Sequence, residues 1–290
     1  MIVGVFGNPR YPGLGGLLER LLAVVPTQDF TLHSEDALAE LWPSPVPRVD
    51  LDDQRPDAVI CFGGDGTMLR TTRAVGPREI PILGVKIGRV GFLTSATPEM
   101  LDDAVMALSL GNYDVESRRM LQASIHDVDG QETIQTTALN DVVVHKAGVA
   151  RVVRLRVVVE EEIGTFSSDG LIVASPTGST AYSLSAGGPI VLPGVDALVV
   201  TPICPHTLAI RPFVVPGDSR IVIELVEPRG EEQVLVSYDG QVGQALALGD
   251  QVVVTRAPFR ARLIRLGTDG FFTRMQRKLQ WGDLSDRDRD

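Results

Sequence analysis

The sequence predicts an α/β plus all-β protein: an N-terminal Rossmann-like α/β domain, a C-terminal β-rich, sandwich-like domain, and a final helix that returns to the N-terminal domain. In residues 1–115, short apolar runs alternate with helix-like segments, which is typical of a parallel sheet with crossover helices. In residues 116–267, many short apolar or alternating segments follow one another, which is typical of a sandwich or closed antiparallel arrangement. The amphipathic residues 271–281 must bury an apolar stripe, and we expect them to pack on the first domain.

The elements of the first domain follow in a regular order. Strands are expected at residues 2–6, 57–62 and 81–85, and helices at residues 14–25, 66–75 and 98–111. The last of these helices has Pro98 at its start, acidic residues in its early turns and Gly111 at its end, which are the usual signals of helix boundaries. Residues from about 268 to 282 complete this domain, with Thr268 and Asp269 as candidate helix caps.

The second domain and the tail are read from the same patterns. Apolar or alternating segments predict strands at residues 121–128, 137–146, 152–160, 170–175, 197–203, 220–227, 232–240, 250–257 and 260–266. Residues 283–290 contain one apolar residue and are mostly charged, so we expect this tail to be disordered.

Composition excludes several classes of function. The formal net charge of −10 would repel a nucleic-acid backbone or an anionic membrane surface, and no run of Lys or Arg overrides it locally. No segment has the roughly 18 apolar residues needed to span a bilayer, and no basic segment precedes the apolar N-terminus. The two cysteines and four histidines have no zinc-site spacing. We therefore expect a cytoplasmic protein with no nucleic acid, membrane or transition metal as partner.

The segment FGGDGT at residues 62–67 contains the first candidate site. Its glycines permit close approach of the backbone, and the helix that follows offers unpaired N–H groups to a phosphate. Asp65 has the wrong charge for simple phosphate binding, and no lysine follows as in a P-loop. A carboxylate here indicates either a cation between it and the phosphates or proton transfer from a neighbouring hydroxyl, and both point to phosphoryl transfer. The alternative is that Asp65 is a turn residue or helix cap.

Three further segments contain candidate ligand-binding residues. Residues 176–188 are rich in hydroxyl groups, which suit a ligand with many hydroxyls and phosphates, and Tyr182 offers a ring that can stack on a base. Alternatively, this is a polar loop before a helix capped by Thr177 or Ser179. Asn140 and Asp141 can bind a base edge and ribose hydroxyls, or can form a β-bulge or turn. Asp239 and Gly240 predict a hairpin turn, with Asp239 as a residue that can lie near the site.

Taken together, these segments closely resemble the NAD kinase family. The matching stretches are GGDGT at 63–67, GxxGFL at 88–93, Arg118-Arg119-Met-Leu, the Asn-Asp pair, SDG at 168–170, PTGSTAYSLSAGGPI at 176–190, TPICPHTL at 201–208, DGQ at 239–241 and KLQW at 278–281. GGDGT alone is shared with phosphofructokinase-like and diacylglycerol-kinase-like proteins. Its combination with PTGSTAYSLSAGG is highly specific.

The resemblance implies transfer of a phosphoryl group from ATP or polyphosphate to the 2′-hydroxyl of the adenosine ribose of NAD, giving NADP. It also implies a divalent cation, most simply Mg²⁺ held largely by the donor phosphates, and a homodimer or homotetramer. By the same match, Asp65 is the general base, and Gly64, Gly66 and Thr67 lie at the phosphates. The remaining residues would bind the dinucleotide: Phe92 beside the adenine, Asn140 and Asp141 on the adenosine, Asp169 toward the nicotinamide, and Thr177, Thr180, Ala181, Tyr182 and Ser185 along the pocket.

One departure from the family pattern affects the donor side. The family usually has Asn two residues before the first glycine of GxxGFL, where this chain has Lys86. Lys86 either adds positive charge toward the phosphate donor or is a solvated surface lysine.

Two other functions compete with this one: a lipid or sugar kinase that uses the same glycine loop, and a dinucleotide-binding regulator without catalysis. The polar 176–188 segment disfavours the lipid kinase, and the presence of Asp65 disfavours the regulator.

Overall fold

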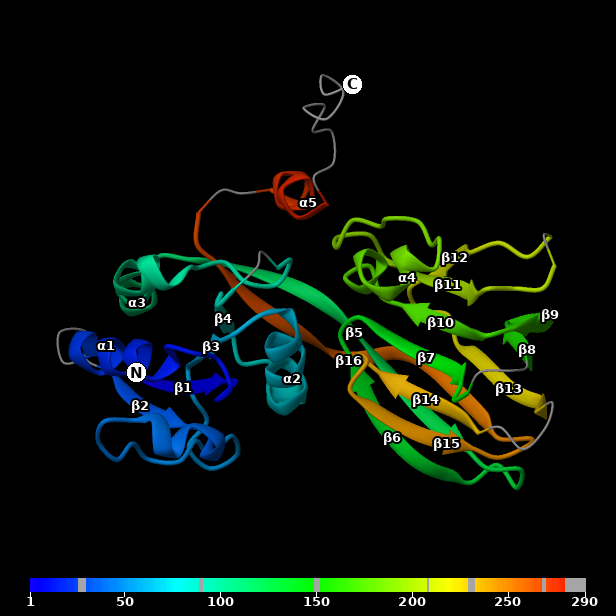
Figure 1. Ribbon diagram of the computed structural model, residues 1–290, viewed down its shortest axis with the longest axis horizontal. Helices are drawn as coiled ribbons and strands as arrows, with labels where there is room; N and C mark the ends of the chain where they lie inside the picture. The colour runs from blue at the N-terminus through cyan, green and yellow to red at the C-terminus, as the bar shows by residue number, and fades with distance from the viewer. Residues whose placement is uncertain are drawn as a thin grey trace, which may run out of the picture. The chain divides into compact units, whose positions relative to one another are not determined.

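The computed structural model describes residues 1–25, 30–88, 91–148, 152–207, 209–228, 233–267 and 270–279 (Figure 1). The chain divides into two compact units: Met1–Ser117 with the described residues from Ala261 onward, and Arg118–Arg260. The chain leaves the first unit after Ser117, where the sequence suggested residue 115, and returns at Ala261, where it suggested about residue 268.

The chain re-enters the first unit earlier than expected because residues 251–265 form one strand, β16 (Gln251–Arg265). Two separate strands, at 250–257 and 260–266, were expected. Its beginning pairs with β13 from Gln251 to Val254, and Leu263 near its end pairs with Ile82. Because both ends are held by backbone pairing, the extended conformation continues through the segment where a break was expected.

The first unit contains a parallel sheet, as the sequence predicts. Its order is β2 (Thr31–Ser34), β1 (Ile2–Gly7), β3 (Ala58–Phe62) and β4 (Ile82–Val85), followed by the end of β16. All residues of β3 and β4 are buried, as is typical of strands covered on both faces. Because these strands are parallel, the segments after β3 and β4 leave the sheet at the same edge.

Helices complete the first unit: α1 (Leu14–Val24), α2 (Asp65–Val75), α3 (Leu101–Leu110) and α5 (Phe271–Leu279), with 3₁₀ turns η2 (Asp36–Leu41), η3 (Gly76–Arg78) and η4 (Pro98–Met100). Helix α1 buries Leu14, Leu18 and Leu21, which share one helical face. The helix expected at 98–111 begins as the 3₁₀ turn at Pro98 and ends at Gly111, whose φ of 66° is the left-handed conformation common at helix C-termini.

The second unit is a sandwich of two antiparallel layers, which confirms the expected class. One sheet has the order β12 (Phe213–Pro216), β11 (Ala197–Ile203), β10 (Gly170–Ala174), β7 (Asp141–Lys146), β14 (Val234–Tyr238) and β15 (Val242–Leu246). The other layer contains β16, β13 (Ile221–Pro228), β8 (Val153–Val159) and β9 (Glu161–Ser168), with β5 (Asp114–His126) and β6 (Glu132–Ala138). One core joins the two layers: it contains Val144 and Leu171 from the first sheet, and Leu155 and Ile223 from the second.

Several short elements of the second unit had no clear sequence signal. Strands β6, β9, β12 and β15 were not predicted, except that the last two residues of β6 fall in the strand expected at 137–146. Most residues of β6, β9 and β12 are exposed or half-buried, so these strands lack a buried apolar pattern. Residues 178–185 form the short η5 (Gly178–Thr180) and α4 (Tyr182–Ser185).

The final helix packs on the first unit, as expected. The ring of Phe271 stacks on that of Phe92 with centroids 6.3 Å apart, and Met275 is buried. The candidate caps Thr268 and Asp269, residues 280–282 of the expected helix, and the tail at 283–290 lie outside the described residues. Of the helices that the structure describes, none has the length and apolar character needed to cross a membrane.

Candidate active site

Asp65 is the first residue of α2 and follows directly on the glycines at the end of β3. The residue in the N-cap position of α2 is Gly64, so Asp65 is not the helix cap. Instead, Oδ2 accepts a hydrogen bond from the N–H of Phe92 at 3.0 Å, and Oδ1 accepts one from the N–H of Leu93 at 3.1 Å. The carboxylate thus holds the segment after β4 against the glycine loop.

Gly91 makes this close approach possible. A Cβ atom at position 91 would lie 2.1 Å from Asp65 Oδ1 and 2.7 Å from its carboxyl carbon, which is far inside contact distance. Only a residue without a side chain lets the 91–93 backbone come this near to the carboxylate.

Helix α5 supplies a cation to the same carboxylate. Lys278 Nζ lies 3.0 Å from Asp65 Oδ2, and it also lies 4.3 Å from the centroid of the Phe92 ring, within the range of a cation–π interaction. Among the described residues, Oδ2 therefore accepts two hydrogen bonds and Oδ1 accepts one. Since each carboxylate oxygen has about two lone-pair positions, Oδ1 has room for one further donor.

The glycine loop is divided between a packed side and an open side. A Cβ at Gly63 would lie 2.4 Å from Thr67 Oγ1, and Thr67 itself is buried, so its hydroxyl packs against the loop. At Gly66, by contrast, a Cβ would meet no atom within 4 Å, and this residue is exposed in the first turn of α2. The N-terminus of α2 thus has an exposed side that suits an anion.

A second cavity, in the second unit, brings two of the predicted segments together. Its volume is about 410 Å³, within the roughly 300–1,000 Å³ typical of ligand sites. The lining residues are Asn140, Asp141, Val143, His145, Ala181, Tyr182, Ser237, Asp239 and Gly240. Four of the predicted dinucleotide-binding residues therefore lie around one cavity: Asn140, Asp141, Ala181 and Tyr182.

Close backbone contact holds the two segments together. A Cβ at Gly178 would lie 2.0 Å from the carbonyl oxygen of Asn140, so only glycine allows this contact. The N–H of Ser175 donates to the same carbonyl at 2.8 Å, and the hydroxyl of Ser175 donates to the carbonyl of Leu139. Neither Thr177 nor Ser179 caps a helix with its side chain; the Ser179 hydroxyl accepts from the N–H of Val191 at 2.9 Å.

Asp239 both forms the predicted hairpin turn and supports the site. Asp239 and Gly240 have φ of 52° and 65° and are the central residues of a turn that the N–H of Gln241 closes on the carbonyl of Tyr238 at 3.1 Å, within the three-residue connection between β14 and β15. The Asp239 carboxylate accepts hydrogen bonds from the N–H groups of Leu139 at 3.0 Å, Asn140 at 2.7 Å and Asp141 at 3.3 Å. It therefore fixes the backbone of the Asn-Asp pair at the beginning of β7.

Asp141 is the perturbed acid of this cavity. Its side chain is buried, with 4% of the residue exposed. Burial, and secondarily the charge of Asp239, raise the pKa of Asp141 from 3.8 to about 7. A carboxyl group that is protonated near neutral pH can donate a hydrogen bond as well as accept one.

Tyr182 presents an exposed side chain at the cavity. Its exposed fraction of 46% leaves much of its surface open for stacking. Partial burial, followed by the charges of Cys204, Asp169 and Asp141, raises the pKa of Tyr182, so its hydroxyl is protonated at neutral pH. Asp169 itself pairs with Lys146 at 2.8 Å and does not line the cavity.

The other predicted residues of this segment lie away from the cavity lining. Thr177 is buried and lies 3.2 Å from an Arg118 guanidinium nitrogen, which donates to its hydroxyl. The Thr180 hydroxyl donates to the carbonyl of Thr177 at 3.2 Å, and Ser185 is exposed at the end of α4.

Sequence reasoning missed several residues that contact the predicted ones or line the same cavity. Lys278 is one, and its signal was present: Arg274, Arg277 and Lys278 are spaced three and four residues apart and share a face of a helix predicted only as amphipathic. His145 and Ser237 are others. Each lies on a strand, where alternation indicates which face a residue occupies but not which neighbouring strand it meets.

No protein-only metal site is evident in the part of the chain that the structure describes, because no three His, Cys, Asp or Glu residues there are grouped to hold an ion. A metal at this site would need most of its ligands from elsewhere, as Mg²⁺ commonly obtains from substrate phosphates and water.

Comparison with known proteins gives consistent matches over both units. Residues 32–113 match the ATP-NAD kinase N-terminal domain, and residues 139–266 match the ATP-NAD kinase C-terminal domain. The chain is 47% identical over 290 residues to the NAD kinase of Gemmatimonas aurantiaca, covering 99% of each chain. It is 40% identical over 283 residues to the NAD kinase of Geotalea daltonii, covering 97% of this chain and 99% of the relative.

Solved structures are also similar. The crystal structure of yeast NADH kinase complexed with NADH superposes with a TM-score of 0.88 at 25% identity, covering 97% of this chain and 88% of that one. An NAD kinase from Archaeoglobus fulgidus, solved in complex with ATP, superposes with a TM-score of 0.71 at 24% identity and shows the same fold.

Proposed function

This chain belongs to the NAD kinase family, and from that membership we propose which of its residues carry out the reaction. The enzyme phosphorylates NAD to NADP. We assign the base and the donor phosphates to the first unit, and the dinucleotide pocket to the second.

Asp65 is the general base of this proposal. The observation that supports it is a carboxylate in the glycine loop that two backbone N–H groups and Lys278 hold in one orientation. As the ribose 2′-oxygen bonds to the phosphorus of the donor, its proton passes to Oδ1, and the bond from phosphorus to the leaving phosphate oxygen breaks in line. The held geometry keeps the carboxylate in one orientation, which is the main contribution a positioned base can make.

The glycine loop and α2 receive the phosphates. Gly64 and Gly66 carry no side chains, Gly66 is exposed in the first turn of α2, and the positive end of the helix dipole lies at this turn. Lys278 lies on Asp65 and offsets its charge, which lowers the repulsion between that carboxylate and an incoming phosphate.

The cavity around Asn140, Asp141, Ala181 and Tyr182 binds the dinucleotide. Its exposed tyrosine ring suits stacking on a base, its amide suits a base edge, and its acid suits ribose hydroxyls. Thr177, Thr180, Ser185 and Asp169 extend this assignment by family resemblance.

ATP is the proposed donor, in keeping with the name of the matching family, and polyphosphate is the alternative. Mg²⁺ is the proposed cation, and when bound it would neutralise charge that develops on the transferred phosphoryl group. Asp65 is the acid closest to the glycine loop that could contribute a ligand, with the donor phosphates supplying the others. We further assign the enzyme to the cytoplasm and to a homodimer or homotetramer, on family resemblance alone.

Formation of NADP tests the proposal. The purified protein is incubated with NAD, Mg²⁺ and either ATP or polyphosphate, and NADP is quantified with an NADP-specific dehydrogenase. Product with one of these donors supports the proposed function. NAD binding without product under either donor would instead indicate a regulator.

A further inference from the structure

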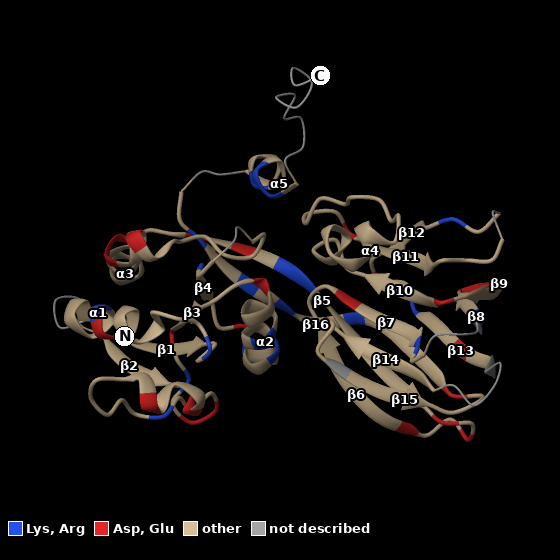
Figure 2. Ribbon diagram, in the orientation of Figure 1, with Lys and Arg blue, Asp and Glu red and all other residues tan. Residues whose placement is uncertain are grey.

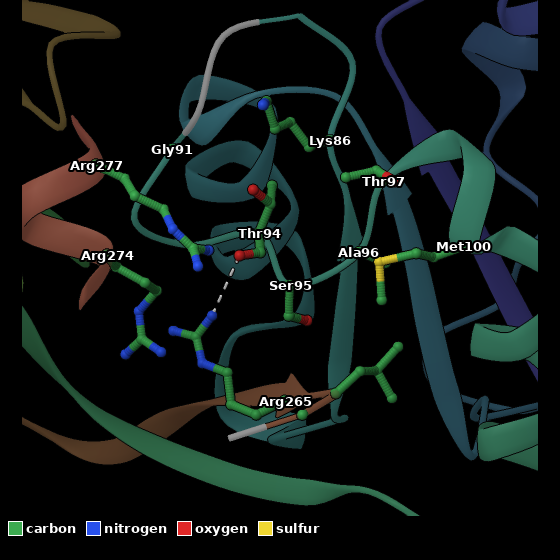
Figure 3. Close-up of a pocket in the computed structure, with 12 residues that line it drawn as sticks. Lys86, Gly91, Thr94, Ser95, Ala96, Thr97, Met100, Arg265, Arg274 and Arg277 are labelled. Carbon is green, nitrogen blue, oxygen red and sulfur yellow. Dashed lines mark hydrogen bonds between the residues drawn. The ribbon is translucent and has the colours of Figure 1, made fainter. Parts of the chain in front are cut away.

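The first unit contains a basic cavity that the assignments above do not use. Its volume is about 240 Å³. Gly91 and residues 94–97 form part of the lining, together with Met100, Leu266 and Gly267, and four cations complete it: Lys86, Arg265, Arg274 and Arg277 (Figure 3). No Asp or Glu is among the described lining residues.

The four cations come from three elements. Lys86 directly follows β4, Arg265 ends β16, and Arg274 and Arg277 lie one turn apart on α5, whose basic face is visible in Figure 2. In Figure 3, Arg277 extends from α5 toward the segment that carries Thr94. Because three separate elements converge on one cavity, the charge is built into the fold and is more than a solvated helix face.

Arg265 has a supporting role in the wall of the cavity. Its guanidinium donates to the carbonyls of Phe92 at 3.4 Å and Leu93 at 3.1 Å, and it pairs with Glu116 at 2.6 Å. Arg274 also lies 3.7 Å from Glu116. Glu116 therefore offsets part of the charge of Arg265 and Arg274. Lys86 and Arg277 line the same cavity.

The cavity adjoins Asp65 through a residue that has no side chain. Gly91 lines the cavity, and its Cβ position would collide with Asp65 Oδ1. The N–H groups of the next two residues donate to Asp65, whereas their carbonyls accept from Arg265, so this strip of backbone lies between the carboxylate and the basic wall.

Lys86 adjoins the glycine loop by backbone pairing. Val85, which precedes it, accepts a hydrogen bond from the N–H of Gly63 at 2.9 Å. The lysine thus leaves the sheet at the same edge as GGDGT, one strand away. GGDGT itself lacks the lysine that follows the glycines of a P-loop.

We propose that this cavity binds the part of the donor's phosphate chain that extends beyond the glycine loop, with Lys86 and Arg277 as the phosphate-binding cations, and this inference rests on the proposed function. The ligand class is a linear chain of linked phosphates, whether from a nucleoside triphosphate or from inorganic polyphosphate. Lysine and arginine are the usual partners of phosphate oxygens, and arginine can bind two of them at once. The volume is below the roughly 300 Å³ at which sites for whole ligands begin, so the cavity suits two or three phosphates and not a complete nucleotide.

The experiment separates binding from turnover. Lys86→Gln, Arg277→Gln and the double variant are compared with wild type by calorimetric titration with tripolyphosphate and with Mg²⁺-ATP. Each lost charged hydrogen bond should weaken binding of either ligand about tenfold, and the double variant should be weaker still. The KM for the donor should rise in parallel, whereas the KM for NAD should stay within about twofold.

Arg48→Gln is the matched control, because Arg48 is an exposed cation of the same unit that pairs with Asp36 at the surface. It should bind both phosphate ligands like wild type, and thermal unfolding should confirm that every variant is folded. Weaker binding of both ligands supports recognition of the phosphates, whereas weaker binding of ATP alone would indicate contact with the nucleoside and would count against the inference.

Three further results would overturn the inference: wild-type protein that does not bind tripolyphosphate, a double variant that binds both ligands normally, or a rise confined to the KM for NAD. Absence of NADP formation by the wild type would refute the proposed function separately, since the titrations need no turnover.

Discussion

Replacement of Asp141 by Asn should stabilise the folded protein, and by an amount that depends on pH. Asp141 is buried beside Asp239, and its pKa is raised from 3.8 to about 7. Asparagine has nearly the same shape without an ionisable group. The substitution therefore removes the cost of a buried acid with little change in packing.

The sign of the effect follows from linkage. Well below pH 3.8, the ordinary pKa, the acid is protonated in both the folded and the unfolded state, so it costs nothing. As pH rises from about 4 to 7, the unfolded chain ionises while the folded protein keeps its proton, and stability falls. Above about pH 7 the cost is constant at roughly 4 kcal/mol, since one pH unit corresponds to about 1.4 kcal/mol. At pH 5 the destabilisation by Asp141 should be below about 2 kcal/mol, because the pH is little more than one unit above the ordinary pKa.

Urea unfolding followed by far-ultraviolet circular dichroism at pH 5 and pH 8 measures this difference. The stability gained by Asp141→Asn should be larger at pH 8 by about 2 to 3 kcal/mol. Asp129→Asn is the control, because Asp129 is an exposed turn residue of the same unit and should give no such pH dependence. An equal gain at both pH values, or a loss at pH 8, would refute the burial argument.

Three further predictions concern the residues around the two sites. Asp65→Asn should lower kcat by about 10² to 10⁴-fold while NAD binding stays nearly unchanged, and near-normal turnover in steady-state assays would remove Asp65 from the role of base. Gly91→Ala should destabilise the protein by about 1 to 3 kcal/mol in thermal or urea unfolding, because its Cβ would overlap the Asp65 carboxylate; unchanged stability would mean that this backbone moves freely. Asp239→Ala leaves three backbone N–H groups without their acceptor and should weaken NAD binding in calorimetric titrations, with Asp239→Asn retaining more; equal affinities in both variants and wild type would show that the turn is fixed without this carboxylate.

Local patterns in the sequence were enough to predict the fold class. The alternation of buried strands with amphipathic helices in residues 1–115, and the succession of short strands after them, are properties of neighbouring residues, and the structure has both. The motif segments were also recognisable, because a glycine loop, a hydroxyl-rich segment and an Asp-Gly turn depend on residue types within a few positions. Weakly patterned strands such as β9 and β12 were missed for the same reason.

The partners of each candidate residue were decided only by the tertiary structure. Asp65 appeared as an isolated acid in an anion-binding turn, yet its carboxylate is held by backbone 27 and 28 residues later and by Lys278, 213 residues later. Asp239 appeared as a turn residue, yet it holds the Asn-Asp pair about 100 residues earlier. Such contacts depend on how whole helices and strands pack. The local spacing of apolar residues does not indicate which helix covers which edge of a sheet. The sequence by itself therefore determined the class of the fold and the chemistry it offers, whereas packing determined which carboxylates are paired, buried or open to a substrate.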